Sequence, residues 1–101
     1  MTVGVFRFSF SSEVPIDEAE MTLQLATFAT EGLFGAARVR LHFGYHIDLN
    51  RRVIIADGSN EVGATVVQIF TGLLLREFGD DSFRVERVDS KPTPPVEAAA
   101  A

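Results

Sequence analysis

Two histidines and two arginines alternate with apolar residues in the middle of the chain, where they could support acid–base or anion-binding chemistry. Arg38, Arg40, His42 and His46 occupy even-numbered positions between 38 and 48, while most of the odd-numbered positions are apolar. Side chains on a β-strand point to opposite faces at successive residues. The alternation therefore predicts a strand over this segment with one ionisable face, which would carry both histidines of the chain.

This predicted strand argues against a metal site. His42 and His46 would lie about 13 Å apart on a strand that rises by about 3.3 Å per residue, so they cannot share one ion. His46 and Asp48 are closer, but two ligands do not make a metal site. The chain has no cysteine, which excludes disulfides, thiolate catalysis and cysteine-ligated zinc. We therefore expect no metal and no cofactor, and a structural polar role for both histidines.

The arginines indicate a second kind of chemistry, the binding of an anion. Guanidinium groups bind carboxylates and phosphates through paired hydrogen bonds. The predicted anion-binding residues, on neighbouring strands of one sheet face, are Arg7, Arg38, Arg40, His42 and Arg84. The alternative is that these arginines pair with nearby acids on a solvated or dimer-buried face, where exposed ion pairs contribute ~0–1 kcal/mol each.

The elements that position these side chains follow from the periodicity of the sequence. Alternating residues predict strands at 3–10, 38–48, 52–56 and 82–88. Polar residues at steps of three and four predict helices from Ile16 to about Glu31 and from about Glu61 to Phe78.

Residues with special backbone preferences mark the ends of these elements. Gly32 and Gly79 are expected to end the two helices, and Ser59 or Asn60 to cap the start of the second one. A tight turn at 48–50, with Asn50 able to take a positive φ, joins the two middle strands. The register of this hairpin at 47–53 stays open by one residue.

The order strand, helix, strand, strand, helix, strand predicts an α+β fold of the ferredoxin-like, split-βαβ type. In this two-layer sandwich a four-stranded antiparallel sheet carries both helices on one face. Residues 1–89 are expected to form a single domain, and 90–101 a disordered tail rich in Pro and Ala. Many functions occur on this fold, so the fold alone predicts none of them.

Composition limits the partners of this domain. The formal net charge is −5, which disfavours nucleic acid. No apolar run approaches the ~20 residues that cross a bilayer, so no membrane association is expected. The first ten residues alternate and lack the features of a signal peptide, and the absence of cysteine favours a reducing compartment. We expect a cytoplasmic protein.

The helices favour association with a partner. Their polar stripes are narrow, which leaves Leu25, Phe28, Leu74 and Leu75 at the margins of the core-facing arcs, unless loop residues cover them. Exposed apolar side chains at such positions would form a docking patch. Closed homo-oligomers are common, and a homodimer is favoured.

We therefore expect a small non-enzymatic binding module that associates with itself and binds a protein or a small anionic ligand on its Arg/His sheet face. The alternative is a small dimeric α/β enzyme. In this alternative His42 or His46 acts as the acid–base catalyst, and Arg38 or Arg40 holds an anionic substrate. A pocket that encloses His42 together with Arg40 would favour the enzyme, and a flat wet face would favour the binding module.

Overall fold

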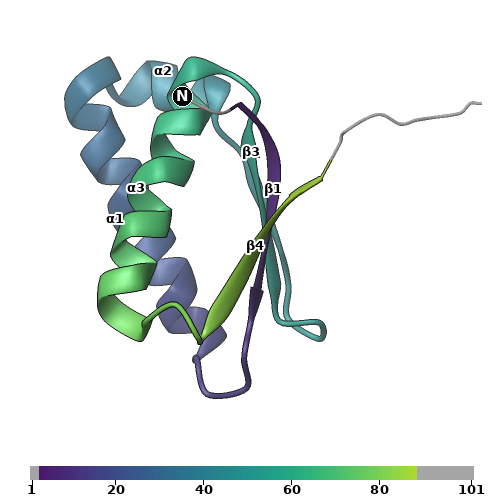
Figure 1. Ribbon diagram of the computed structural model, residues 1–101. Helices are drawn as coiled ribbons and strands as arrows, with labels where there is room; N and C mark the ends of the chain where they lie inside the picture. Colours follow the sequence, from purple (N-terminus) through teal and green to yellow (C-terminus); the bar gives the residue numbers. More distant parts are fainter. Residues whose placement is uncertain (1–2, 89–101) are drawn as a thin grey trace, which may run out of the picture.

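The structure of the protein is a computed structural model that describes residues 3–88 (Figure 1). Within these residues the chain is an α+β protein with one four-stranded antiparallel sheet and three helices. The tail expected at 90–101 lies outside the described residues. None of the described helices is both long enough and apolar enough to cross a membrane.

The helices and the sheet form two layers. The strands β1 (Gly4–Phe10), β2 (Tyr45–Asp48), β3 (Val53–Gly58) and β4 (Phe83–Val88) lie in the order β2-β3-β1-β4. The helices α1 (Ile16–Phe34), α2 (Ala36–His42) and α3 (Glu61–Phe78) all lie on one side of this sheet (Figure 1). No described element covers the other side, which we call the outer sheet face.

The core fills the space between the sheet and the helices. Phe8 and Ile54 are opposite each other on β1 and β3, and both are fully buried. The ring of Phe8 lies 4.7 Å from that of Phe70 on α3, measured between ring centroids. The hairpin register that the sequence left open is given by the pairing of β2 with β3, which places Ile47 opposite Ile54 and Asp48 opposite Val53. Ile54 therefore faces the helices, and Ile55 faces away from them.

The strand predicted over 38–48 is wrong in its first half. Residues 36–42 form α2, and β2 begins only at Tyr45. Val39 is 1% exposed and Leu41 is 82% exposed, although the alternation would place both on one strand face. Ala, Arg and Leu favour the helix by intrinsic propensity. Phe43 packs against the core four residues after Val39, a spacing that suits a helical turn better than a strand.

Two predicted positive-φ or capping positions are also corrected. Gly32 lies inside α1, and the helix ends instead at Gly35, whose φ of 88° lets the chain turn into α2. In the hairpin the positive φ of 58° belongs to Arg52, not to Asn50. The Arg52 guanidinium donates hydrogen bonds to the carbonyls of Ser11, at 2.9 Å, and Val14. These charged hydrogen bonds offset the cost of the left-handed backbone.

The predicted start and end of α3 are confirmed. The Asn60 side chain accepts a hydrogen bond of 2.8 Å from the backbone N–H of Gly63, and the helix ends at Gly79 with a φ of 84°. Asn60 also donates, through Nδ2, a bond of 2.7 Å to the carbonyl of His42. One side chain thus caps α3 and ties it to the end of α2.

Candidate functional site

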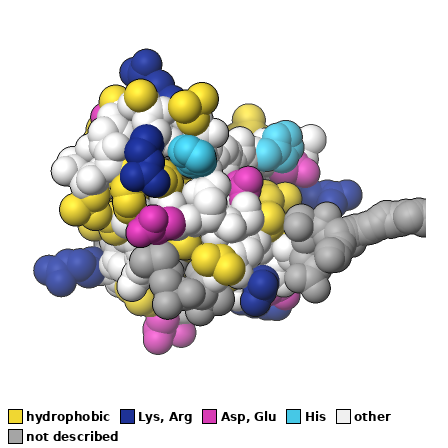
Figure 2. Space-filling model, turned by 90° about the horizontal axis from the view of Figure 1, so that it is seen from above, with side chains coloured by type: hydrophobic (Ala, Val, Ile, Leu, Met, Phe, Trp, Pro, Cys, Tyr) yellow, Lys and Arg dark blue, Asp and Glu magenta, His cyan; other side chains and the backbone are white. Residues whose placement is uncertain are grey.

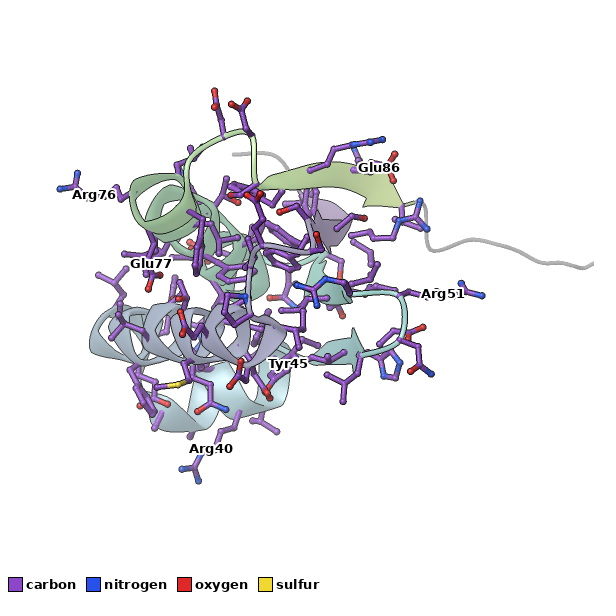
Figure 3. All side chains as sticks on the ribbon, turned by 90° about the horizontal axis from the view of Figure 1, so that it is seen from below. Arg40, Tyr45, Arg51, Arg76, Glu77 and Glu86 are labelled. Carbon is purple, nitrogen blue, oxygen red and sulfur yellow. The ribbon has the colours of Figure 1, made fainter. Side chains whose placement is uncertain are left out.

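The structure divides the predicted anion-binding residues between two layers. Arg7 and Arg84 lie on the outer sheet face, on β1 and β4. Arg38, Arg40 and His42 lie on α2, among the helices. In Figure 3 Arg40 and Glu86, the β4 neighbour of Arg7, lie at opposite ends of the molecule. The expected common Arg/His face is therefore wrong, because a helix replaces the first half of the predicted strand.

Two of these arginines have local partners. Arg7 donates a hydrogen bond of 2.7 Å to Oε1 of Glu86 on the neighbouring strand. This bond, together with the positive charge of Arg7, holds the pKa of Glu86 below its ordinary value of 4.5. The guanidinium of Arg38 lies over the ring of Phe34, 4.9 Å from its centroid. Both contacts stabilise the surface of the protein locally.

The histidines are on separate elements. His42 is the last residue of α2, and His46 lies on β2 opposite Ile55, on the outer sheet face. They appear as two separate cyan groups in Figure 2. Within residues 3–88 no three His, Asp or Glu side chains are grouped closely enough to hold a metal ion.

A groove of ≈ 850 Å³ lies between α1 and α3, on the side away from the sheet. We call it the α1–α3 groove. Its lining residues are Glu18, Met21, Thr22, Gln24, Leu25 and Phe28 of α1 and Leu73, Arg76 and Glu77 of α3. A volume of this size lies within the range of ligand-binding clefts.

Three large apolar side chains of α1 border this groove and face solvent. Met21 is 70% exposed, Leu25 is 56% exposed and Phe28 is 62% exposed. Their spacing of four and three residues places them on one side of the helix. The prediction that Leu25 and Phe28 form an exposed patch is confirmed, and Met21 extends it by one turn.

The remaining predicted patch residues have different positions. Leu75 is exposed, as predicted, but Leu74 is fully buried on the core side of α3. Leu33, which the sequence placed in a loop that could cover the patch, instead belongs to α1 and is 70% exposed. The stripe of Met21, Leu25 and Phe28 is therefore uncovered within the described residues.

Two of the three charged residues that line the groove are acidic, Glu18 and Glu77, and the third is Arg76. The four charged residues of α1 are Asp17, Glu18, Glu20 and Glu31, and this helix has no Lys or Arg. On α3, Arg76 points away from the body of the protein in Figure 3, while Glu77 points toward α1. The Thr22 hydroxyl donates a hydrogen bond of 2.6 Å to Oε1 of Glu77 and holds that carboxylate at the edge of the groove.

A second hollow of ≈ 450 Å³ continues from this groove toward α2 and β2. It shares Gln24 and Phe28 with the groove and is also lined by Thr27, Val39, Arg40, Phe43, Gly44 and Tyr45. The hydroxyl of Tyr45 donates a hydrogen bond of 3.0 Å to Oε2 of Glu20. Burial raises the pKa of Tyr45 above its ordinary value of 10.0; a hydrogen bond with Gln24 lowers it in part, and the hydrogen bond and charge of Glu20 raise it.

The sequence carried part of the signal for this site. The spacing of Met21, Leu25 and Phe28 and the absence of basic residues from 16–34 can be read from the sequence. The second hollow cannot, because Val39 and Arg40 reach it only when 36–42 are helical. Comparison of the chain with protein-family models, curated proteins and solved structures finds no match.

Proposed function

We propose that the protein is a non-enzymatic binding module whose α1–α3 groove binds a basic, amphipathic helical segment of a partner protein. One observation carries the proposal: a stripe of three exposed apolar side chains borders a groove whose α1 wall has only acidic charges. Large exposed apolar patches on small proteins mark interaction sites.

The shape of the stripe favours a helix as the occupant. From Met21 to Phe28 the stripe is about 10 Å long at a rise of 1.5 Å per residue, which corresponds to two helical turns of a partner. Helices that dock in apolar grooves present their anchors at the same spacing of three and four residues. Leu73 of α3 supplies an apolar wall opposite the stripe.

The charge of the groove favours a basic partner. Glu18 and Glu77 line the groove on its two walls, against the single arginine Arg76, and the other charged residues of α1 are also acidic. A segment with lysine or arginine beside its apolar anchors would pair with these acids, whereas an acidic segment would be repelled. A small anionic ligand has less support, because the five residues that were to bind it lie on two different layers.

The enzyme alternative has less support. It required a hollow that encloses His42 and Arg40, but neither of the two hollows described above is lined by a histidine. Arg40 contributes to the second hollow, yet Figure 3 draws its guanidinium turned away from the protein.

We also propose that the fold is ferredoxin-like, with α2 as an additional helix between α1 and β2. Its support is the strand order β2-β3-β1-β4 and the hairpin of β2 and β3 between two helix-containing connections. The absence of cysteine supports our expectation that the protein acts in the cytoplasm.

Fluorescence anisotropy with a labelled model peptide tests the proposed binding. The probe is a peptide of Leu and Lys about four helical turns long, with leucines at steps of three and four. We expect it to bind, and we expect Leu25→Gln to weaken binding about tenfold. Leu49→Gln is the matched control, because Leu49 is 66% exposed but lies in the turn between β2 and β3.

Two further comparisons separate specific docking from general attraction. Glu18→Gln should weaken binding more than Glu61→Gln, which removes the same charge from the first turn of α3, outside the groove. A scrambled peptide of the same composition should bind less tightly, because its leucines do not share one side of a helix. Equal affinities for Leu25→Gln and Leu49→Gln, or for the two peptides, would overturn the proposal.

A further inference from the structure

The outer sheet face carries apolar side chains that do not belong to the core. Val5, Val53, Ile55 and Val88 point away from the helices, are only half-buried, and lie outside the hydrophobic core. Charged side chains lie among them, at the row ends on β2 and β4 and also on the central strands, where Arg7 and Asp57 stand. The face thus mixes half-buried apolar side chains with charges of both signs, and such a mixed surface is compatible with a non-obligate protein interface.

The charges on this face follow a regular order across the strands. One row, from β2 to β4, is His46, Ile55, Arg7 and Glu86. The next row is Asp48, Val53, Ser9 and Arg84. The two ends of each row carry groups that can attract each other. The first row has the imidazole of His46 at its β2 end and the carboxylate of Glu86 at its β4 end, and the second has Asp48 and Arg84.

We propose that the outer sheet face binds a second copy of this chain, with a two-fold axis parallel to the strands. Such a rotation exchanges β2 with β4 and β3 with β1, and it places each row opposite its own copy in reverse order. Asp48 then faces Arg84 of the partner subunit, and His46 faces Glu86 of the partner subunit. Ile55 packs on the aliphatic stem of Arg7 of the partner subunit.

A two-fold axis across the strands is the other face-to-face symmetry, and it places each strand on its own copy. Along the row of Arg7 it would set Arg7 against Arg7 of the partner subunit and Glu86 against Glu86, and like charges in contact disfavour an interface. Between the two rows it would instead set Glu86 against Arg84 of the partner subunit, so the recovery of the dimer on mixing Asp48→Arg with Arg84→Glu, expected only for the axis parallel to the strands, distinguishes the two symmetries. Packed sheets are usually rotated by about 30°, which moves the ends of a row by only a few ångströms, within reach of an arginine side chain.

The size of the face sets the expected strength of the dimer. Four strands spaced about 4.8 Å apart and about six residues long cover roughly 20 by 20 Å, or about 800 Å² over both copies. Stable complexes usually bury roughly 1,200–2,000 Å² of surface over both partners, which is more than this face offers. We therefore expect a reversible, concentration-dependent dimer. The inference goes beyond the proposed function, because it assigns a different surface and leaves both α1–α3 grooves facing outward.

Sedimentation velocity at increasing protein concentration tests the dimer. The unaltered chain should shift from monomer to dimer, and Asp48→Arg or Arg84→Glu should each raise the dissociation constant at least about tenfold. An equimolar mixture of these two variants should dimerise again, because it pairs unlike charges at both ends of the row. Arg87→Glu is the matched control: Arg87 is exposed on β4 but points to the opposite side of the sheet from Arg84.

Circular dichroism of each variant checks that it is folded. Asp48 also accepts a hydrogen bond from the backbone N–H of Arg51, so Asp48→Arg can disturb the turn. Arg84 makes no side-chain hydrogen bond or ion pair within residues 3–88, although its charge acts on Glu86 of the same strand. Arg84→Glu therefore disturbs no turn and tests the interface if the first variant does not fold.

Three results would overturn the dimer: a monomer at all concentrations, a folded mixture that does not dimerise, or an equal effect of Arg87→Glu. If Leu25→Gln instead dissociates the dimer, then the second copy binds the α1–α3 groove and the outer sheet face does not. Peptide binding without dimerisation would refute this inference and leave the proposed function intact.

Discussion

Thr22 of α1 donates a hydrogen bond of 2.6 Å to the carboxylate of Glu77 on α3. Thr22 is only 5% exposed, whereas Glu77 faces solvent at the edge of the α1–α3 groove. The bond joins the two walls of the groove at the end where α1 begins and α3 ends. The bond therefore helps to hold α1 and α3 together and also fixes the position of Glu77 at the proposed binding site.

Replacing the hydroxyl of Thr22 should weaken this link. Thr22→Val keeps the size of the side chain but removes the donor, so we expect the free energy of unfolding to fall by about 1 kcal/mol. Thr27→Val is the control, because Thr27 donates only within α1, to the carbonyl of Leu23 at 2.9 Å. Urea denaturation measures both variants. Equal losses would mean that the contact with Glu77 contributes nothing to stability.

Gly63 is expected to tolerate no side chain. A Cβ at this position would overlap the carbonyl oxygen of Asp57, a backbone atom that cannot move without distorting β3. Gly63→Ala should lower the free energy of unfolding by about 2–3 kcal/mol. Gly72→Ala, in the same helix but facing open space, should raise it by about 0.5–1 kcal/mol. Thermal and urea denaturation would contradict this account if both variants changed stability in the same direction.

Tyr45 offers a direct test of the second hollow, because it is the single tyrosine of the chain. Burial and Glu20 raise its pKa, so the folded state favours the neutral phenol. This contribution to stability is present below the ordinary pKa of 10.0 and is lost as the pH rises through the raised pKa of the folded protein. Tyrosinate absorbance should show a lower pKa in Glu20→Gln. An unchanged titration would mean that Glu20 does not act on the phenol.

Much of the layered fold could be predicted from local patterns. The strand at the N-terminus and the long helices have clear periods of two and of three to four, and burial reinforces both. The strand prediction for the first half of 38–48 was wrong because the alternation there competes with helix propensity. Val39 and Phe43 satisfy a helical spacing as well as an alternating one, so tertiary packing decides between them.

The candidate site was predictable to a smaller extent. Leu25 and Phe28 could be identified because a narrow polar stripe leaves neighbouring apolar residues exposed. The predicted Arg/His face failed together with the strand that was to carry it. The rows of side chains on the outer sheet face depend on the register of the strands. That register depends on turn geometry and on long-range pairing, which one sequence does not determine.

Nuclear magnetic resonance mapping with the Leu–Lys peptide tests the central claim most directly. The account predicts that the largest shift changes fall on the methyl and ring resonances of Met21, Leu25 and Phe28, while Val53 and Ile55 on the outer sheet face stay unchanged. Changes concentrated on Val53 and Ile55, or no changes at peptide excess, would contradict the assignment of the α1–α3 groove as the binding site.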